Sequence, residues 1–147
     1  MPPRNHSNWT KNPNIEYISS ECYNNHEIYL REQEEIFSKV WVPMCHISEM
    51  RDVFCYRTTQ IAGKNVIAWN KGNGICAYLN TTVQAPSGKK YNSEGLGKEL
   101  HCEVKHGGMV WVTLDPNPTQ SVDEWTAGAF DCIADAIDTE EMEVFHY

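Results

Sequence analysis

The chain has 147 residues, 41% of them hydrophobic, and a formal net charge of −8 at pH 7. This length suits one ordinary domain whose core needs no disulfides, and the acidic balance argues against a nucleic-acid partner because phosphates would be repelled. No apolar stretch approaches the roughly 20 residues of a membrane span, and the N-terminus lacks the apolar region of a signal peptide. We therefore expect a cytoplasmic protein that binds neither nucleic acid nor membrane.

The first 43 residues predict an arm and then a helix. Residues 1–18 are rich in proline and asparagine, which is typical of an extended arm on a surface. A helix is expected over about residues 24–39, with Asn24 as its N-cap and Glu27 three residues later, and Pro43 prevents it from continuing. Its apolar face holds Tyr29, Ile36, Phe37 and Val40.

From residue 52 the pattern changes to short β-type runs separated by turn residues, as in small antiparallel barrels or sandwiches. Glycine-containing turns join the first three runs, and a further hairpin turns at His106 and Gly107. The two prolines of DPNP stop the last of them. The expected strands are VFCYRTTQI, NVIAWN, GICAYLN, KELHCEVK and GMVWVTL, and MEVFHY at the end is typical of the beginning of another.

A short second helix is expected after Ser121, because Ser121 and Glu124 form a capping-box pattern. The elements together predict a mainly β domain of about six to eight antiparallel strands, in a small barrel or sandwich. One N-terminal helix and the short C-terminal helix flank it. The residues expected to be largely buried are Trp41, Val53, Ile67, Trp69, Tyr78, Val110 and Val112.

The residues that bind metals are scattered. The six cysteines never form the C-x-x-C pair of structural zinc sites, so we interpret them as reduced thiols, some packed as small apolar side chains. Most histidines are isolated as well, and His101 and His106 fall on an expected hairpin. The cysteines are Cys22, Cys45, Cys55, Cys76, Cys102 and Cys132.

The order of several segments carries a family resemblance. A helix, SKVWVPMCHISEM, IAGKNVIAW, AYLN, GGMVWVTLDPNP and SVDEW follow one another along the chain. In this order they resemble the N-terminal domain of Rieske-type non-haem iron oxygenase α subunits, the ring-hydroxylating oxygenases, over about Tyr17 to Tyr147. The resemblance implies a Rieske-like domain over residues 19–147, with a helix packed on a β-fold. In the family, Cys-x-His and Cys-x-x-His loops hold a [2Fe–2S] cluster and a larger iron-containing catalytic domain follows.

The first cluster loop is where the chain departs from this family. In the family, Leu-Asn is followed after one residue by the Cys-x-His pair, which would fall on Thr82 and Gln84. Neither side chain can replace a thiolate or an imidazole at iron. We therefore expect that the [2Fe–2S] cluster is lost.

Two alignments are open for the second ligand pair. Cys102 and His106 stand near the expected place, but three residues separate them instead of two. Alternatively, KELHCEVKHGGMVWVTLDP corresponds to the late hairpin that closes the family's Rieske fold, with both cluster loops shortened away. We favour the second alignment because the strand alternation and LDPNP then fit without a gap. Since Tyr147 falls near the expected start of the catalytic domain, that domain is expected to be absent.

Three hypotheses of function follow. The first is a degenerate Rieske-like module, an accessory or structural subunit that forms a homo-oligomer or docks on an oxygenase subunit. The second is an electron-transfer or metal-binding protein that uses Cys102 and His106, with His101, Cys76 or Cys45. The third is the N-terminal part of a split oxygenase. The side chains expected at an interface are Trp125, Phe130, Val144, Phe145 and Tyr147.

Overall fold

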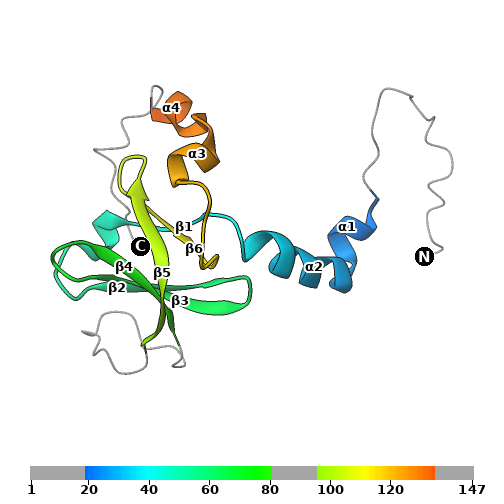
Figure 1. Cartoon of the computed structure of the whole chain (residues 1–147), viewed down its shortest axis with the longest axis horizontal. Coiled ribbons are helices and arrows are strands. Elements are labelled where there is room, and N and C mark those ends of the chain that lie inside the picture. The colour runs from blue at the N-terminus through cyan, green and yellow to red at the C-terminus, as the bar shows by residue number, and fades with distance from the viewer. Residues whose placement is uncertain (1–18, 81–95, 135–147) are drawn as a thin grey trace, which may run out of the picture.

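The computed structural model describes residues 19–80 and 96–134 (Figure 1). Its six strands form one antiparallel sheet in the order β1-β6-β5-β4-β3-β2, which curls so that the edge strands β1 and β2 come near each other. This nearly closed barrel confirms the predicted mainly β fold. The strands are β1 (Val42–His46), β2 (Tyr56–Ile61), β3 (Lys64–Asn70), β4 (Ile75–Asn80), β5 (Leu96–Lys105) and β6 (Met109–Thr113).

Tight turns set the register of the hairpins. The β2–β3 turn places Ala62 at φ 47° and Gly63 at φ 71°, the left-handed pair that matches the twist of the flanking strands. The β5–β6 turn ends at Gly108, where a Cβ atom would lie 2.8 Å from both His46 Nε2 and Ile47 Cγ1. Only glycine fits there, because β1 continues into a short 3-10 helix, η3 (Ile47–Met50), that crosses this turn closely.

The main core fills the inside of the barrel. Alternate residues of the central strands point inward, so that Val66, Val110 and Val112 are completely buried beside Met50. A second cluster joins Trp41 and Trp111 to Val122, the first residue of α3 (Val122–Thr126). The indole N–H of Trp41 donates a 2.8 Å hydrogen bond to the Gln120 carbonyl, which fixes the chain that leads into α3.

Most of the predicted core residues are buried. Trp41, Ile67, Tyr78, Val110 and Val112 are each less than 10% exposed, which confirms the prediction for them. The prediction for Val53 is wrong, because this side chain is 48% exposed. β2 begins only at Tyr56, so Val53 lies in the preceding turn, where Phe54 has φ 71°. Trp69 is only partly buried.

The predicted N-terminal helix is present but divided. It consists of α1 (Glu21–Asn24), α2 (His26–Glu32) and a π-helical turn, η2 (Gln33–Phe37). Asn25 separates the first two in an extended conformation and caps α2, since its side-chain oxygen accepts from Glu27 N at 2.9 Å and from Ile28 N. The N-cap is therefore Asn25 and not Asn24, because the chain bends one residue later than predicted.

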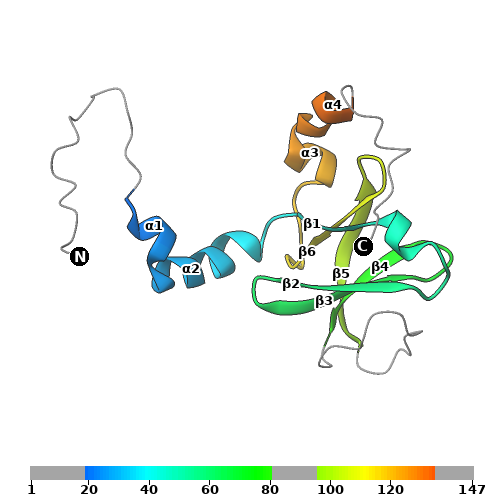
Figure 2. The same ribbon diagram turned by 180° about the vertical axis from the view of Figure 1, so that it is seen from behind.

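Residues 21–37, which we call the helical arm, project away from the barrel in both views (Figures 1 and 2). None of its three segments contains a buried residue. The expectation that this helix packs on the β-fold is therefore wrong, and within residues 19–80 and 96–134 nothing covers its apolar face. No helix within residues 19–80 and 96–134 is long and apolar enough to cross a membrane.

The C-terminal helix forms as predicted. The Ser121 side chain accepts from Glu124 N at 3.3 Å, and Ser121 N donates to the Glu124 carboxylate at 2.8 Å, which completes the capping box. A second short helix, α4 (Ala129–Ala134), follows α3 after a left-handed turn at Ala127. The expected arm at residues 1–18 and the expected strand MEVFHY lie outside the described residues.

Candidate functional site

The first expected ligand positions, Thr82 and Gln84, lie outside the described residues. The strands on either side, β4 and β5, pair directly with Ala77 opposite Leu100. The segment 81–95 therefore links the ends of two adjacent, hydrogen-bonded strands.

The thiol of Cys102 belongs to the barrel core. Cys102 lies on β5 opposite Val112 of β6 and packs against the main core cluster. Burial raises the pKa of its thiol to about 12, and the neighbouring Cys76 and Glu103 add to the effect. Burial likewise raises the pKa of the Cys45 thiol on β1 to about 12. Thiols buried in this way are protonated near neutral pH and chemically inert.

His106 faces a different part of the molecule. It occupies the β5–β6 turn with φ 54°, and its ring stacks on Phe130 with 4.4 Å between centroids. The ring also meets Trp111 edge-on at 5.9 Å, and its Nε2 lies 3.4 Å from Thr126 Oγ1. Because this ring packs with α3 and α4 while Cys102 packs in the barrel, the two side chains do not converge on one point.

Two further histidines have hydrogen bonds to the backbone. His46 Nε2 donates to the Gly107 carbonyl at 2.7 Å, and its Nδ1 accepts from Ser48 N at 3.2 Å. His101 Nε2 donates to the Pro116 carbonyl at 3.1 Å. Both imidazoles therefore hold neighbouring segments of the backbone together.

The donors in the described part of the chain do not fit a [2Fe–2S] cluster. Such a Rieske cluster needs two thiolates on one iron and two imidazoles on the other. Within residues 19–80 and 96–134, no three His, Cys, Asp or Glu side chains come together in a way that could hold a metal ion. Cys102 and His106, the pair considered from the sequence, face apart.

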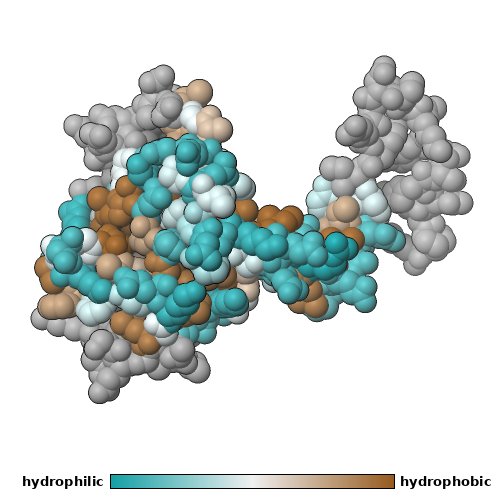
Figure 3. Space-filling view, viewed as in Figure 1, coloured by the Kyte–Doolittle hydropathy of each residue, from teal (hydrophilic) through white to brown (hydrophobic). Residues whose placement is uncertain are grey.

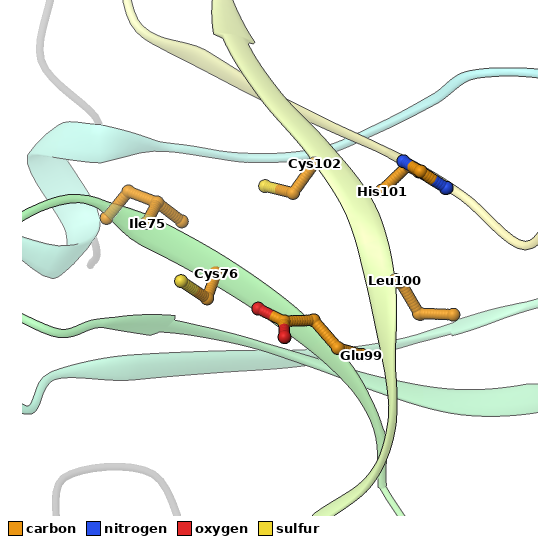
Figure 4. A pocket seen from close by; sticks show the side chains of 6 residues that line it. All are labelled: Ile75, Cys76, Glu99, Leu100, His101 and Cys102. Carbon is orange, nitrogen blue, oxygen red and sulfur yellow. The ribbon is translucent and has the colours of Figure 1, made fainter. Parts of the chain in front are cut away.

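A pocket of about 430 Å³ lies along the β4–β5 pair (Figure 4). A second pocket of about 260 Å³ lies between β5 and residues 118–121 and shares His101 and Cys102 with it. The Glu99 carboxylate of the larger pocket already accepts a 3.2 Å hydrogen bond from the Tyr78 hydroxyl. The larger pocket is lined by Ile75, Cys76, Glu99, Leu100, His101 and Cys102.

Lys71, the residue after β3, contacts Tyr78, whose hydroxyl also binds the Glu99 carboxylate of the larger pocket. The Lys71 ammonium donates to the Tyr78 hydroxyl and lies 4.9 Å from the Tyr78 ring centroid and 5.9 Å from that of Trp69. The hydrogen bond to Tyr78 raises the pKa of Lys71. In the β3–β4 hairpin Trp69 pairs with Cys76, and Lys71 and Tyr78 each lie two residues further along, so they share one face of the sheet. This register could have pointed to the contact from the sequence. Together with Glu99 these side chains link the β3–β4 hairpin to β5.

Comparisons with known proteins identify the relationship. No family model matches the chain. The methanesulfonate monooxygenase hydroxylase subunit alpha of Methylosulfonomonas methylovora is 32% identical over 199 residues, which covers 100% of this chain and 48% of that protein. The 2-aminobenzenesulfonate 2,3-dioxygenase subunit alpha of Alcaligenes is 39% identical over 87 residues, or 58% of this chain and 22% of that protein. In structure, the quaternary ammonium Rieske monooxygenase CntA superimposes with a TM-score of 0.73 at 19% identity, covering 86% of this chain and 48% of CntA.

The chain is related to the α subunits of Rieske oxygenases. Naphthalene 1,2-dioxygenase shares the fold too, with a TM-score of 0.67 over 85% of this chain and 37% of its own. The present chain spans about half the length of the methanesulfonate enzyme subunit that it matches. The two sequence relatives are alpha subunits of oxygenases, and inter-subunit electron transfer is described for CntA.

The residues expected at an interface differ in what the structure shows of them, and only Trp125 and Phe130 are described. Trp125 on α3 is 45% exposed and accessible to a partner. Phe130 on α4 is partly buried, because its ring is stacked on His106 and meets Trp111 edge-on at 5.2 Å. Val144, Phe145 and Tyr147 lie outside the described residues. The interface over residues 125–147 stays a prediction.

Proposed function

We propose that this chain is a Rieske-like module without cluster ligands, which serves as an accessory or structural subunit beside an oxygenase polypeptide. The observation that carries the proposal is the donor set. By the family resemblance, the first ligand pair would fall on Thr82 and Gln84, which cannot bind iron as a thiolate or an imidazole does. Cys102 packs in the barrel core while His106 stacks on Phe130. Residues 19–80 and 96–134 bring no thiolates and imidazoles together as a Rieske cluster requires, which supports the loss of the cluster.

The length of the match to the methanesulfonate enzyme supports the same proposal. That alignment runs over 199 residues and includes all 147 residues of this chain, so 52 positions of the relative have no counterpart here. We place much of this difference at residues 81–95, since β3 to β6 form an unbroken series of paired neighbours on either side of it. The cluster loops are then shortened away, and KELHCEVKHGGMVWVTLDP is the hairpin that closes the fold, here β5 and β6.

The two other hypotheses have less support. An electron-transfer or metal-binding role would need Cys102 and His106 to bind the same metal ion, and their side chains pack in separate clusters. A split oxygenase is tested by sequencing the adjacent reading frame for a catalytic domain.

The six cysteines are all free, which supports a reducing compartment such as the cytoplasm.

Iron and sulfide analysis tests the loss of the cluster. The full chain is purified without oxygen in the presence of iron and sulfide, beside the Rieske monooxygenase CntA as a positive control. We expect a colourless protein, with less than about 0.1 iron per chain and no paramagnetic signal after reduction. Stoichiometric iron with acid-labile sulfide would overturn the proposal, and loss of that iron in Cys102→Ala would then identify Cys102 as a ligand.

A further inference from the structure

The helical arm leaves a group of large apolar side chains uncovered. The arm carries brown, apolar atoms on its surface among teal, polar ones (Figure 3), and unlike the barrel it contains no buried residue in any of its three segments. Monomeric proteins rarely leave contiguous apolar patches in solvent unless the patch binds something. The exposed fractions are 82% for Tyr23, 50% for Tyr29, 52% for Leu30, 49% for Ile36 and 41% for Phe37.

The spacing of these side chains puts them on one side of the arm. Tyr29 and Ile36 are seven residues apart, and so are Leu30 and Phe37, along the continuous helix formed by α2 and η2. Seven residues are close to two helical turns, so the two pairs lie above one another as a stripe. Tyr23 is exposed as well, on α1 beyond the extended residue Asn25. Such a stripe fits the groove of a partner in the way an amphipathic helix does.

The charge of the arm selects among partners. Its 17 residues carry five glutamates and one arginine, and Arg31 lies 3.5 Å from Glu35. A second copy would bring glutamates against glutamates, which is unfavourable. The rim of a complementary groove is therefore basic. The glutamates are Glu21, Glu27, Glu32, Glu34 and Glu35.

The comparisons indicate where such a groove belongs. The match to the methanesulfonate enzyme subunit includes all of this chain, and hence the arm, but only 48% of that subunit. In that relative, the counterpart of the arm is thus part of a polypeptide with a further half that can cover it. We propose that the helical arm docks into an apolar groove with a basic rim on a separate oxygenase polypeptide that supplies this other half. The inference rests on the proposed function, because it names the surface through which the accessory subunit binds.

A matched pair of variants tests this inference in the native host. Tagged full-length chain is recovered as the wild type, as the arm variant Leu30→Glu/Phe37→Glu, and as the control Val104→Glu, whose side chain on β5 is 40% exposed. Retained polypeptides are identified by mass spectrometry. We expect the wild type and the control to retain an oxygenase catalytic polypeptide and the arm variant at least about tenfold less of it. Retention should also fall as salt is raised, because the rim contacts are between charges.

The possible outcomes separate the two proposals. Equal retention by the arm variant, with circular dichroism showing all three proteins folded, would overturn the docking of the arm and leave the accessory function standing. No oxygenase polypeptide on the wild type or the control would overturn both. A wild-type dimer that becomes monomeric in the arm variant, seen by sedimentation, would overturn the proposed partner in favour of a second copy of this chain.

Discussion

The barrel and the helical arm place the same kinds of side chain in opposite environments. Val66, Val110 and Val112 in the barrel are completely buried, while Leu30 and Ile36 in the arm are about half exposed. Both regions have a regular apolar pattern in the sequence. The difference teaches that periodicity tells which side chains share a face, and that the covering of the face depends on what else the chain or its partner supplies. Five predictions test this contrast.

Cysteine reactivity should show the largest difference. Cys45 in the barrel is buried with its pKa near 12, whereas Cys22 on α1 is exposed. A pKa of about 12 in place of the ordinary 9.0 leaves Cys45 about a thousandfold less thiolate near neutral pH, before its burial is considered. A thiol reagent followed by peptide mapping should therefore label Cys22 at once and Cys45 only after unfolding. Fast labelling of Cys45 in the native protein would contradict its place in the core.

Removing a core side chain should cost the most stability. Met50 is 1% exposed and belongs to the main core cluster, so Met50→Ala leaves a cavity there. We expect the free energy of unfolding to fall by about 2–5 kcal/mol. Urea denaturation followed by circular dichroism measures it, and an unchanged midpoint would show that the barrel is not closed around this residue.

Gly108→Ala should be the next most damaging change. The new Cβ would lie 2.8 Å from His46 Nε2 and Ile47 Cγ1, and the residue has φ 103°. We expect a loss of about 1–3 kcal/mol from the strained backbone, with the contact adding to it. Gly63→Ala is the matched control, because Gly63 also has positive φ but nothing within 4 Å of its Cβ position. Equal losses in the two variants would remove the close approach as the cause.

The capping box of α3 should make stability depend on acid. Hydrogen bonds from the Ser121 N–H and hydroxyl lower the pKa of Glu124 from its ordinary 4.5. A carboxyl with a lowered folded-state pKa stabilises above its unfolded value, and this contribution disappears as the pH falls through the lowered pKa. Glu124→Ala should therefore unfold at a lower temperature at pH 7, with the gap to wild type shrinking below about pH 4.5. Ser121→Ala should show the same trend, and a pH-independent gap would contradict the ionised bond.

The smallest effect is expected in the arm. Leu30 is 52% exposed and no residue of α2 is buried, so Leu30→Ala removes little packing within this chain. We expect the free energy of unfolding to change by no more than about 0.5 kcal/mol in the isolated protein. Urea denaturation beside Met50→Ala provides the comparison. A loss above about 2 kcal/mol would mean that the arm folds against the barrel.

The fold could be predicted from the sequence wherever local chemistry decides the structure. Glycine turns and alternation gave β2 to β6, and the Ser121 and Glu124 pair gave α3, because these features act within a few residues. The sequence analysis does not predict β1, because Pro43 indicates that the helix ends but not that a strand begins there. An edge strand tolerates proline, and the register of β1 against β6 shifts between Pro43 and Cys45.

The candidate site was less predictable because it depends on contacts across the chain. The sequence placed Cys102 and His106 on one hairpin, but only the packing of Phe130 and Trp111 shows which way the imidazole faces. Lys71 directly follows β3, and only the register of β3 and β4 shows that its ammonium group reaches Tyr78. The separation of the helical arm from the barrel was not predicted either, because the apolar pattern of residues 21–37 does not say what covers it.

The pairing of β1 with β6 also sets the order in which this molecule can assemble. β2, β3 and β4 are joined by tight hairpins and can form as soon as they are made, but Val42 must find Val112, about seventy positions later. Closing so long a loop costs entropy before any contact is gained, which makes this the slow step of folding. Until β6 emerges from the ribosome, β1 has no strand to pair with and the edge of β5 stays open to other chains. A nascent chain stalled before Met109 would therefore be the form of this protein most in need of a chaperone.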